Sequence, residues 1–173
     1  LKALPSCKTI YVSANVYERI AYRGGTEGIV ATIRMKQHGL DTLPPPTQSH
    51  APLYVVLECV EKPGNLWDIL RSADAAGVDA VIVCDPLTDL YNPNLIRSSL
   101  GGIFSVPTVA CTSTDCIQYF KSKGIRILTA QLQDSSLYYD TDMTVPTAIV
   151  MGTEATGLTD QWRQAADAHI RIP

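Results

Sequence analysis

The amino-acid sequence predicts an α/β protein in which helices cover both faces of a parallel β-sheet. Two observations lead to this fold class. Short apolar runs alternate along the chain with segments whose apolar residues recur at helical spacing. The runs are apolar at consecutive positions, which is typical of strands buried on both faces of a sheet. With 173 residues, a net charge of −3 and 46% hydrophobic residues, the composition excludes a disordered or collagen-like chain.

The first strand and the first helix of this pattern are marked most clearly. LYVVLECV (53–60) is a continuous apolar run, and NLWDILRSADAAG (65–77) carries apolar residues at helical spacing. Asn65 is a good N-cap for this helix, and Gly77 is a good terminator. We therefore expect a strand followed by an amphipathic helix.

The same alternation continues along the rest of the chain. Functional residues are expected in the loops after the strands, because ligands of such sheets bind beyond the carboxyl ends of the strands. The later elements are expected in this order: a strand over 79–85, a short helix and turn over 93–104, a strand after Pro107, a helix over 115–124 capped by Thr114 and ended by Gly124, a strand over 125–130, a looser stretch over 131–146, a strand over 147–151, a helix over 160–167 capped by Thr159, and a final strand over 168–172.

A proline-rich stretch, residues 37–52, divides the chain and is expected to be a linker. Residues 1–36 carry a net charge of +4, and the remainder carries −7. This asymmetry indicates that a polyanion is met mainly at the amino-terminal end or in one local groove, although a sample of charges this small can also be uneven by chance. The chain opens on Leu1 without an initiator methionine, so we expect it to be part of a longer protein.

Several classes of protein are disfavoured by what the sequence lacks. It has no apolar run long enough to span a membrane and no signal peptide, so we expect a cytoplasmic protein without a membrane partner. The five cysteines form no CxxC pair, and we expect core thiols and no metal site. Neither GxGxxG nor GxxxxGK[ST] occurs, which argues against a dinucleotide site and a phosphate-binding P-loop.

Three separated blocks resemble one known family. They are LECVEKPGNLWDILRSADAAGVDAVIV (57–83), RSSLGGIFSVP (97–107) and IVMGTEATGLTDQWRQAADAHIRIP (149–173). In this order they resemble the SPOUT superfamily, in particular the SpoU (TrmH-like) RNA ribose 2′-O-methyltransferases, over about residues 53–173. GGTEGIVATI (24–33) looks like the end of the L30e-like RNA-binding domain that often precedes this catalytic domain.

The resemblance implies a fold, a cofactor and partners. It implies a SPOUT-type domain with a trefoil knot at the carboxyl end, S-adenosylmethionine as methyl donor, a homodimer, and methyl transfer to a ribose 2′-hydroxyl of ribosomal or transfer RNA. The domains expected on this basis are 1–36 as the end of an L30e-like domain, 37–52 as the linker and 53–173 as the methyltransferase domain.

The resemblance also implies roles for individual residues. Asn65 and Arg71 match the polar pair of the family's first motif, which helps to place the target nucleotide. The alternatives from the residues alone are that Asn65 caps its helix and that Arg71 forms exposed ion pairs with Asp68 or Asp74. Arg71 stays protonated and cannot be a general base, but it can grip a phosphate and stabilise charge near the attacking oxygen.

The second motif, GTEATG, places Glu154 between two glycines and implies an orienting role for it. A plain strand-to-helix turn would also favour glycines at these positions. The donor pocket is assigned to residues of this motif and of the loops after the neighbouring strands: Thr129, Ala130, Met151, Gly152, Gly157 and Ile172.

The sequence departs from the family pattern at two places. Trp67 stands where the family usually has glycine, and the chain stops at Pro173, where the third motif is expected to begin. Both departures favour an alternative function, a catalytically inactive RNA-binding homologue of the same fold. A third reading, an unrelated α/β enzyme that uses another nucleotide, is disfavoured by the missing phosphate loop.

Overall fold

The computed structural model describes residues 7–21, 28–35, 38–43, 50–60 and 63–173. Contacts divide the chain into two units, Leu1–Lys36 and Gln37–Pro173. The first unit contains the short helix α1 (Ala14–Ile20), and none of its described residues is buried. Residues 24–27 of the segment GGTEGIVATI lie outside the described residues.

The second unit begins with a segment that packs on the core. Pro44–Pro46, which suggested a linker, lie outside the described residues. Just before them, the 3₁₀ turn η1 (Leu40–Thr42) leads to Leu43, whose side chain is only 7% exposed and belongs to the hydrophobic core. The first half of the proline-rich stretch therefore includes a residue that is anchored in the core.

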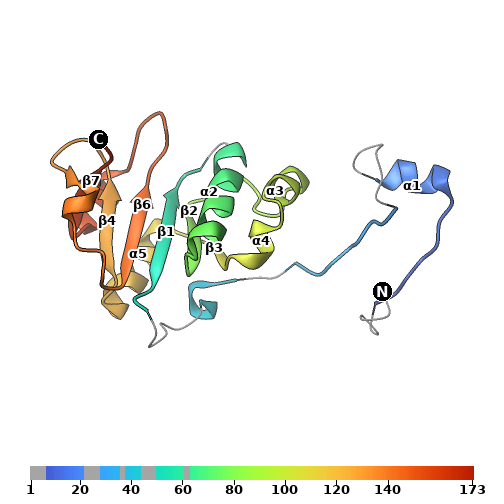
Figure 1. Cartoon of the computed structure of the whole chain (residues 1–173), viewed down its shortest axis with the longest axis horizontal. Helices are drawn as coiled ribbons and strands as arrows, with labels where there is room; N and C mark the ends of the chain where they lie inside the picture. The colour runs from blue at the N-terminus through green and yellow to red at the C-terminus, as the bar shows by residue number, and fades with distance from the viewer. Residues whose placement is uncertain (1–6, 22–27, 36–37, 44–49, 61–62) are drawn as a thin grey trace. The chain divides into compact units, whose positions relative to one another are not determined.

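Seven strands form a single parallel sheet in the described part of the chain (Figure 1). Their order across the sheet is β3-β2-β1-β6-β4-β7-β5, so β6 lies between β1 and β4. The bounds are β1 Leu53–Glu58, β2 Ala80–Cys84, β3 Thr108–Cys111, β4 Arg126–Ala130, β5 Ser136–Leu137, β6 Thr147–Met151 and β7 Ala168–Arg171. The predicted parallel sheet is confirmed.

Helices cover both faces of this sheet, as predicted. On one face, Leu66 and Leu70 of α2 pack with Leu57 and Val81 of the sheet. On the other face, the fully buried Trp162 belongs to the second hydrophobic cluster. The helices are α2 (Pro63–Ala76), α3 (Pro93–Ser98) and α4 (Gly102–Ser105) on the first face, and α5 (Ser113–Lys123) and α6 (Asp160–Ala165) on the second.

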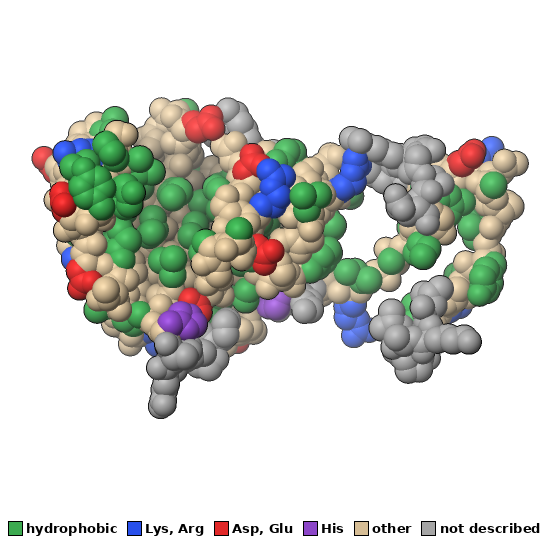
Figure 2. Space-filling view, viewed as in Figure 1, with side chains coloured by type: hydrophobic (Ala, Val, Ile, Leu, Met, Phe, Trp, Pro, Cys, Tyr) green, Lys and Arg blue, Asp and Glu red, His purple; other side chains and the backbone are tan. Residues whose placement is uncertain are grey.

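Strand β6 is covered less completely on one face than on the other. Ala148 and Val150, which point toward α5 and α6, are fully buried. Ile149 and Met151, which point to the opposite face, are only half-buried. Figure 2 shows hydrophobic side chains at the surface over this part of the sheet.

Two predicted helix caps are wrong. Helix α2 begins at Pro63, a residue suited to the first helical turn, so Asn65 lies inside the helix and is not its N-cap. Helix α5 is capped by Thr112 and not by Thr114, because the Thr112 side chain accepts a hydrogen bond of 3.1 Å from the backbone N–H of Asp115.

The predicted ends of these two helices are confirmed. Gly77 and Gly124 follow α2 and α5 with φ angles of +66° and +65°, the left-handed conformation that glycine adopts without a steric cost. The stretch 131–146 contains the edge strand β5 and the 3₁₀ turn η2 (Tyr138–Asp140), which are too short to be recognised by periodicity.

Candidate functional site

The carboxyl ends of three adjacent strands bring together most of the residues assigned to the donor pocket. β4 lies between β6 and β7, and Thr129 is the register partner of both Val150 and His169. Thr129 and Ala130 therefore lie at the same edge of the sheet as Met151, the last residue of β6. Ile172 follows β7 directly, and its side chain is 73% exposed.

The loop after β6 folds back on itself. The backbones of Thr153 and Gly157 exchange two hydrogen bonds, of 3.2 and 3.0 Å. A Cβ added to Gly152 would lie only 2.2 Å from the carbonyl carbon of Gly157, and Gly157 itself has a φ of +70°. Both glycines are therefore required by the backbone of this loop. Since this requirement exists without any ligand, the glycines alone do not identify a binding site.

Glu154, at the tip of the folded loop, contacts the first motif. The side-chain Nδ2 of Asn65 donates a hydrogen bond of 2.8 Å to Glu154 Oε1. These two residues are 89 positions apart in the chain. The contact brings together two of the three residues predicted to be catalytic, at the junction between α2 and the loop after β6.

Arg71 lies on the exposed surface of α2, one turn further along the helix than Trp67. Its guanidinium forms an ion pair with Asp68 and donates a hydrogen bond of 3.0 Å to the carbonyl oxygen of Ser98. The ion pair expected from the residues alone is therefore present. A guanidinium has five N–H donors, so these two contacts still allow it to bind an anionic group.

Glu58, which the sequence reasoning did not single out, fixes the position of the loop after β6. Its carboxylate is only 3% exposed. It accepts hydrogen bonds of 2.9 Å from the backbone N–H of Thr159 and 2.6 Å from the Thr159 hydroxyl. Thr159 is the N-cap position of α6, as predicted, but its side chain caps no helix N–H and binds Glu58 instead. An acidic residue at the end of an otherwise apolar run was the available signal.

Thr129 is fully buried and has a polar partner. Its hydroxyl oxygen lies 2.6 Å from Nδ1 of His169, on the adjacent strand β7. The imidazole is half-buried. Thr129 can therefore shape the floor of the site, while its hydroxyl is already engaged with the histidine.

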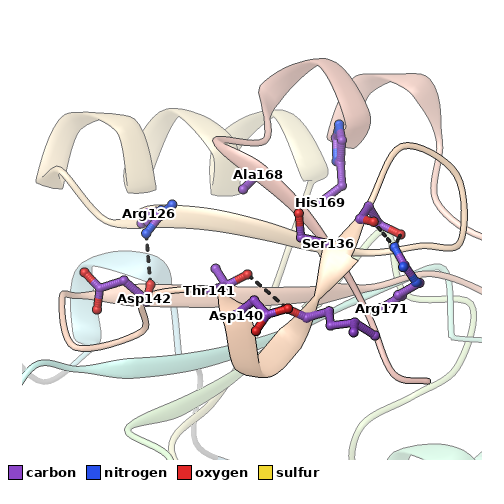
Figure 3. A pocket seen from close by; sticks show the side chains of 10 residues that line it. Arg126, Ser136, Asp140, Thr141, Asp142, Ala168, His169 and Arg171 are labelled. Carbon is purple, nitrogen blue, oxygen red and sulfur yellow. Dashed lines mark hydrogen bonds between the residues drawn. The ribbon is translucent and has the colours of Figure 1, made fainter.

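A hollow of about 520 Å³ lies at the β5 end of the sheet (Figure 3). Arg126, which donates a hydrogen bond of 2.9 Å to the carbonyl oxygen of Asp142, contributes to its wall. Hydrogen bonds from Thr144 lower the pKa of the Asp142 carboxyl group. None of the residues predicted for the site lines this hollow. It is lined by the first residues of β4 and β7, Arg126 and Ala168, and also by Arg171 at the carboxyl end of β7, so it runs along the β5 side of the sheet and is not confined to the carboxyl ends of the strands, where ligands of parallel sheets bind.

The described residues include no helix that is both long and apolar enough to cross a membrane. The described helix that carries the first motif, α2, is amphipathic and packs its apolar side on the sheet.

Comparison with known structures identifies the class of protein. The chain resembles the AdoMet-bound rRNA methyltransferase of Sinorhizobium meliloti, with a TM-score of 0.73 and 30% identity over 80% of this chain and 52% of the other. It resembles the SpoU methyltransferase AviRb of Streptomyces viridochromogenes, solved with the cofactor AdoMet, with the same TM-score and identity over 80% of this chain and 56% of the other. The fold is thus that of the SpoU class of RNA methyltransferases.

The family follows from the sequence comparison. Residues 52–173 match the SpoU rRNA Methylase family, and the chain belongs to that family. It is 34% identical over 152 residues to the 23S rRNA (uridine(2479)-2'-O)-methyltransferase of Streptomyces viridochromogenes, covering 84% of this chain and 52% of the relative. The chain spans between 48% and 60% of the length of this and two further curated relatives that it matches.

Proposed function

We propose that this chain is the catalytic part of an S-adenosylmethionine-dependent methyltransferase that acts on a ribose 2′-hydroxyl of ribosomal or transfer RNA. Membership of the SpoU family supports this, as do relatives named as 23S rRNA 2′-O-methyltransferases. The observation that carries the proposal is the contact between Asn65 and Glu154, which joins the two sequence motifs into one site.

The residues at the ends of β4, β6 and β7 fit such a donor in chemical character. Met151 and Ile172 offer apolar surface, and Gly152 brings backbone to this edge without a side chain. Thr129 and Ala130 complete the floor. S-adenosylmethionine, when bound, supplies an electrophilic methyl group on a positively charged sulfur.

The chain's own residues would then bind and align the RNA. The Arg71 guanidinium binds a phosphate of the target and holds positive charge near the attacking ribose oxygen. Asn65 orients the nucleotide, and Glu154 holds the Asn65 amide in place through their hydrogen bond. The main contribution of the protein to catalysis is then to align the ribose oxygen with the methyl carbon.

The remaining parts of the proposal concern segments and partners. Residues 1–36, with a net charge of +4, are proposed to be the end of an L30e-like RNA-binding domain that is joined by residues 37–52 to the methyltransferase domain over 53–173. A trefoil knot, a homodimer and a cytoplasmic location complete the proposal, and all three rest on the family.

Replacement of Arg71 tests the proposal. We expect Arg71→Ala to abolish the transfer of labelled methyl groups to RNA, while calorimetric binding of S-adenosylmethionine changes by less than about twofold, because the side chain contacts RNA and not the donor. Lys121→Ala is the matched control, since it removes one positive charge from exposed α5 on the opposite face of the sheet.

Two outcomes would contradict the assignment. A fully active Arg71→Ala variant would exclude Arg71 from the site. A wild-type chain that binds RNA but transfers no methyl group, even when it is extended to the length of its relatives, would identify the alternative, a catalytically inactive RNA-binding homologue.

A further inference from the structure

Three cysteines that are separate in the sequence meet in the fold. Cys84 ends β2, Cys111 ends β3, and Cys116 lies in the first turn of α5. Cys84 and Cys111 are register partners on parallel strands, so their side chains point to the same face of the sheet. The spacing of the cysteines along the chain gave no sign of this group, because Cys84 is 27 positions before Cys111.

The three sulfur atoms have the spacing of a metal-binding group. The Sγ atoms of Cys84 and Cys111 are 3.9 Å apart, and all three Sγ atoms lie within 4.8 Å of one another. Three thiolates around a Zn²⁺ ion, each at about 2.3 Å, are separated by about 3.8–4.0 Å. Small side-chain rotations are therefore enough to place one ion between the three sulfur atoms.

The group has an entry path and a favourable electrostatic environment for a cation. Cys84 and Cys116 are fully buried, whereas Cys111 is half-buried and lines a hollow of about 630 Å³. Asp85 and Asp115 line the same hollow and give its mouth a negative charge that attracts cations. The sulfur atoms also lie near the amino end of the 11-residue helix α5, where the helix dipole stabilises thiolates.

We propose that Cys84, Cys111 and Cys116 bind one thiophilic metal ion of the Zn²⁺ class. This site is separate from the Asn65–Glu154 contact, and it does not depend on the proposed methyl transfer. Among the described residues, the group contains no histidine or carboxylate ligand. Soft thiolate ligands select Zn²⁺ or Cu⁺ over hard cations such as Mg²⁺, and water from the hollow that Cys111 lines can take the fourth position of a tetrahedral site. Binding displaces the three thiol protons to solvent.

The test is a metal titration of the reduced, metal-stripped chain. We expect one Zn²⁺ per chain in competition with a chromophoric chelator, and a sulfur-to-metal charge-transfer band of three-thiolate intensity when Co²⁺ replaces Zn²⁺. Cys111→Ser is the main variant, because Cys111 is the only half-buried member of the group and its replacement is least disruptive to the core. We expect this variant to bind Zn²⁺ about a hundredfold more weakly, since loss of a supporting residue alone costs up to about that factor.

Matched controls separate this group from the other cysteines. Cys7→Ser removes an exposed thiol and should leave Zn²⁺ affinity unchanged. Cys59→Ser should also leave it unchanged, although Cys59 lies in a second group with Glu58 and Asp85. Circular dichroism of each metal-free variant shows whether it folds.

Three results would overturn the proposal. The first is a reduced wild-type chain that binds Zn²⁺ no more tightly than Cys111→Ser does. The second is a Zn²⁺ affinity that is lowered by Cys59→Ser and not by Cys111→Ser. The third is a disulfide between Cys84 and Cys111, found by mass spectrometry in the chain as purified, that persists under conditions where the remaining thiols are reduced.

Discussion

Replacement of Glu58 tests whether this buried carboxylate holds the loop after β6 in place. Glu58→Ala removes two hydrogen bonds to a charged acceptor and leaves the backbone N–H of Thr159 without its partner. Hydrogen bonds to charged groups contribute about 1.5–3 kcal/mol each, and part of this is recovered by solvent at the exposed Thr159, so we expect the free energy of unfolding to fall by about 3 kcal/mol.

Glu58→Gln separates the hydrogen bonds from the charge. The glutamine amide oxygen can accept from the Thr159 N–H, while its NH₂ group donates to the Thr159 hydroxyl, which rotates to accept. Only the charge assistance is then lost, so we expect a fall of about 1 kcal/mol. Urea unfolding with linear extrapolation measures both variants, and Asp160→Ala, which removes an exposed carboxylate beside Thr159, is the control.

The contact between Glu58 and Thr159 also has a functional consequence. If Glu58 positions the loop, Glu58→Ala should weaken S-adenosylmethionine binding by about tenfold or more under conditions where the variant is still folded, whereas Glu58→Gln should retain most of the affinity. Equal destabilisation by Ala and Gln would refute the hydrogen-bonding account. Unchanged donor affinity in a destabilised Glu58→Ala chain would show that the contact supports stability alone.

Three further perturbations have expected outcomes. Gly152→Ala should weaken donor binding by about tenfold or more in calorimetry, because its Cβ would lie 2.2 Å from the carbonyl carbon of Gly157 and the loop would have to open. Burial raises the pKa of Tyr54 from 10.0 to about 12. The folded state therefore holds the phenolic proton more tightly than the unfolded state, and wild-type stability should fall as the pH rises from 10 to about 12. Tyr54→Phe should lack that loss, and at neutral pH it should be at least as stable, since the hydroxyl has no hydrogen-bond partner among the described residues. Trp162→Phe should lower the free energy of unfolding by about 1–3 kcal/mol in urea, because it removes a buried hydrogen bond of 2.9 Å to Ser113 and leaves a small cavity.

The local features of the fold could be predicted from the sequence because they depend on residues close together in the chain. The apolar run at 53–60 and the helical spacing up to Gly77 depend only on near neighbours. The two cap errors have the same local origin, since several residues near a helix start can serve as its cap. Asn65 and Thr114 are residue types that favour a cap, but the residue type alone did not decide where each helix begins.

The long-range features could not be predicted in this way. The periodicity of apolar residues predicts where strands occur but not their order in the sheet, which places β6 between β1 and β4. The contact of Glu58 with Thr159, 101 positions later, depends on that order. The family resemblance implied a role for Asn65 and another for Glu154. That the two side chains are hydrogen-bonded to each other is seen only in the structure.

The position of β6 has a consequence for synthesis of the protein. Leu53 in β1 pairs with Thr147 in β6, and 94 positions of chain separate them. At ribosomal rates of about 5–20 residues per second, β6 is synthesised roughly 5–20 s after β1, and during this time one edge of β1 lacks its neighbouring strand. During that interval β1, α2 and β2 can already dock on one another, but an unpaired hydrophobic strand is open to association with other nascent chains. Slow assembly, and dependence on chaperones during translation, are therefore expected of this topology.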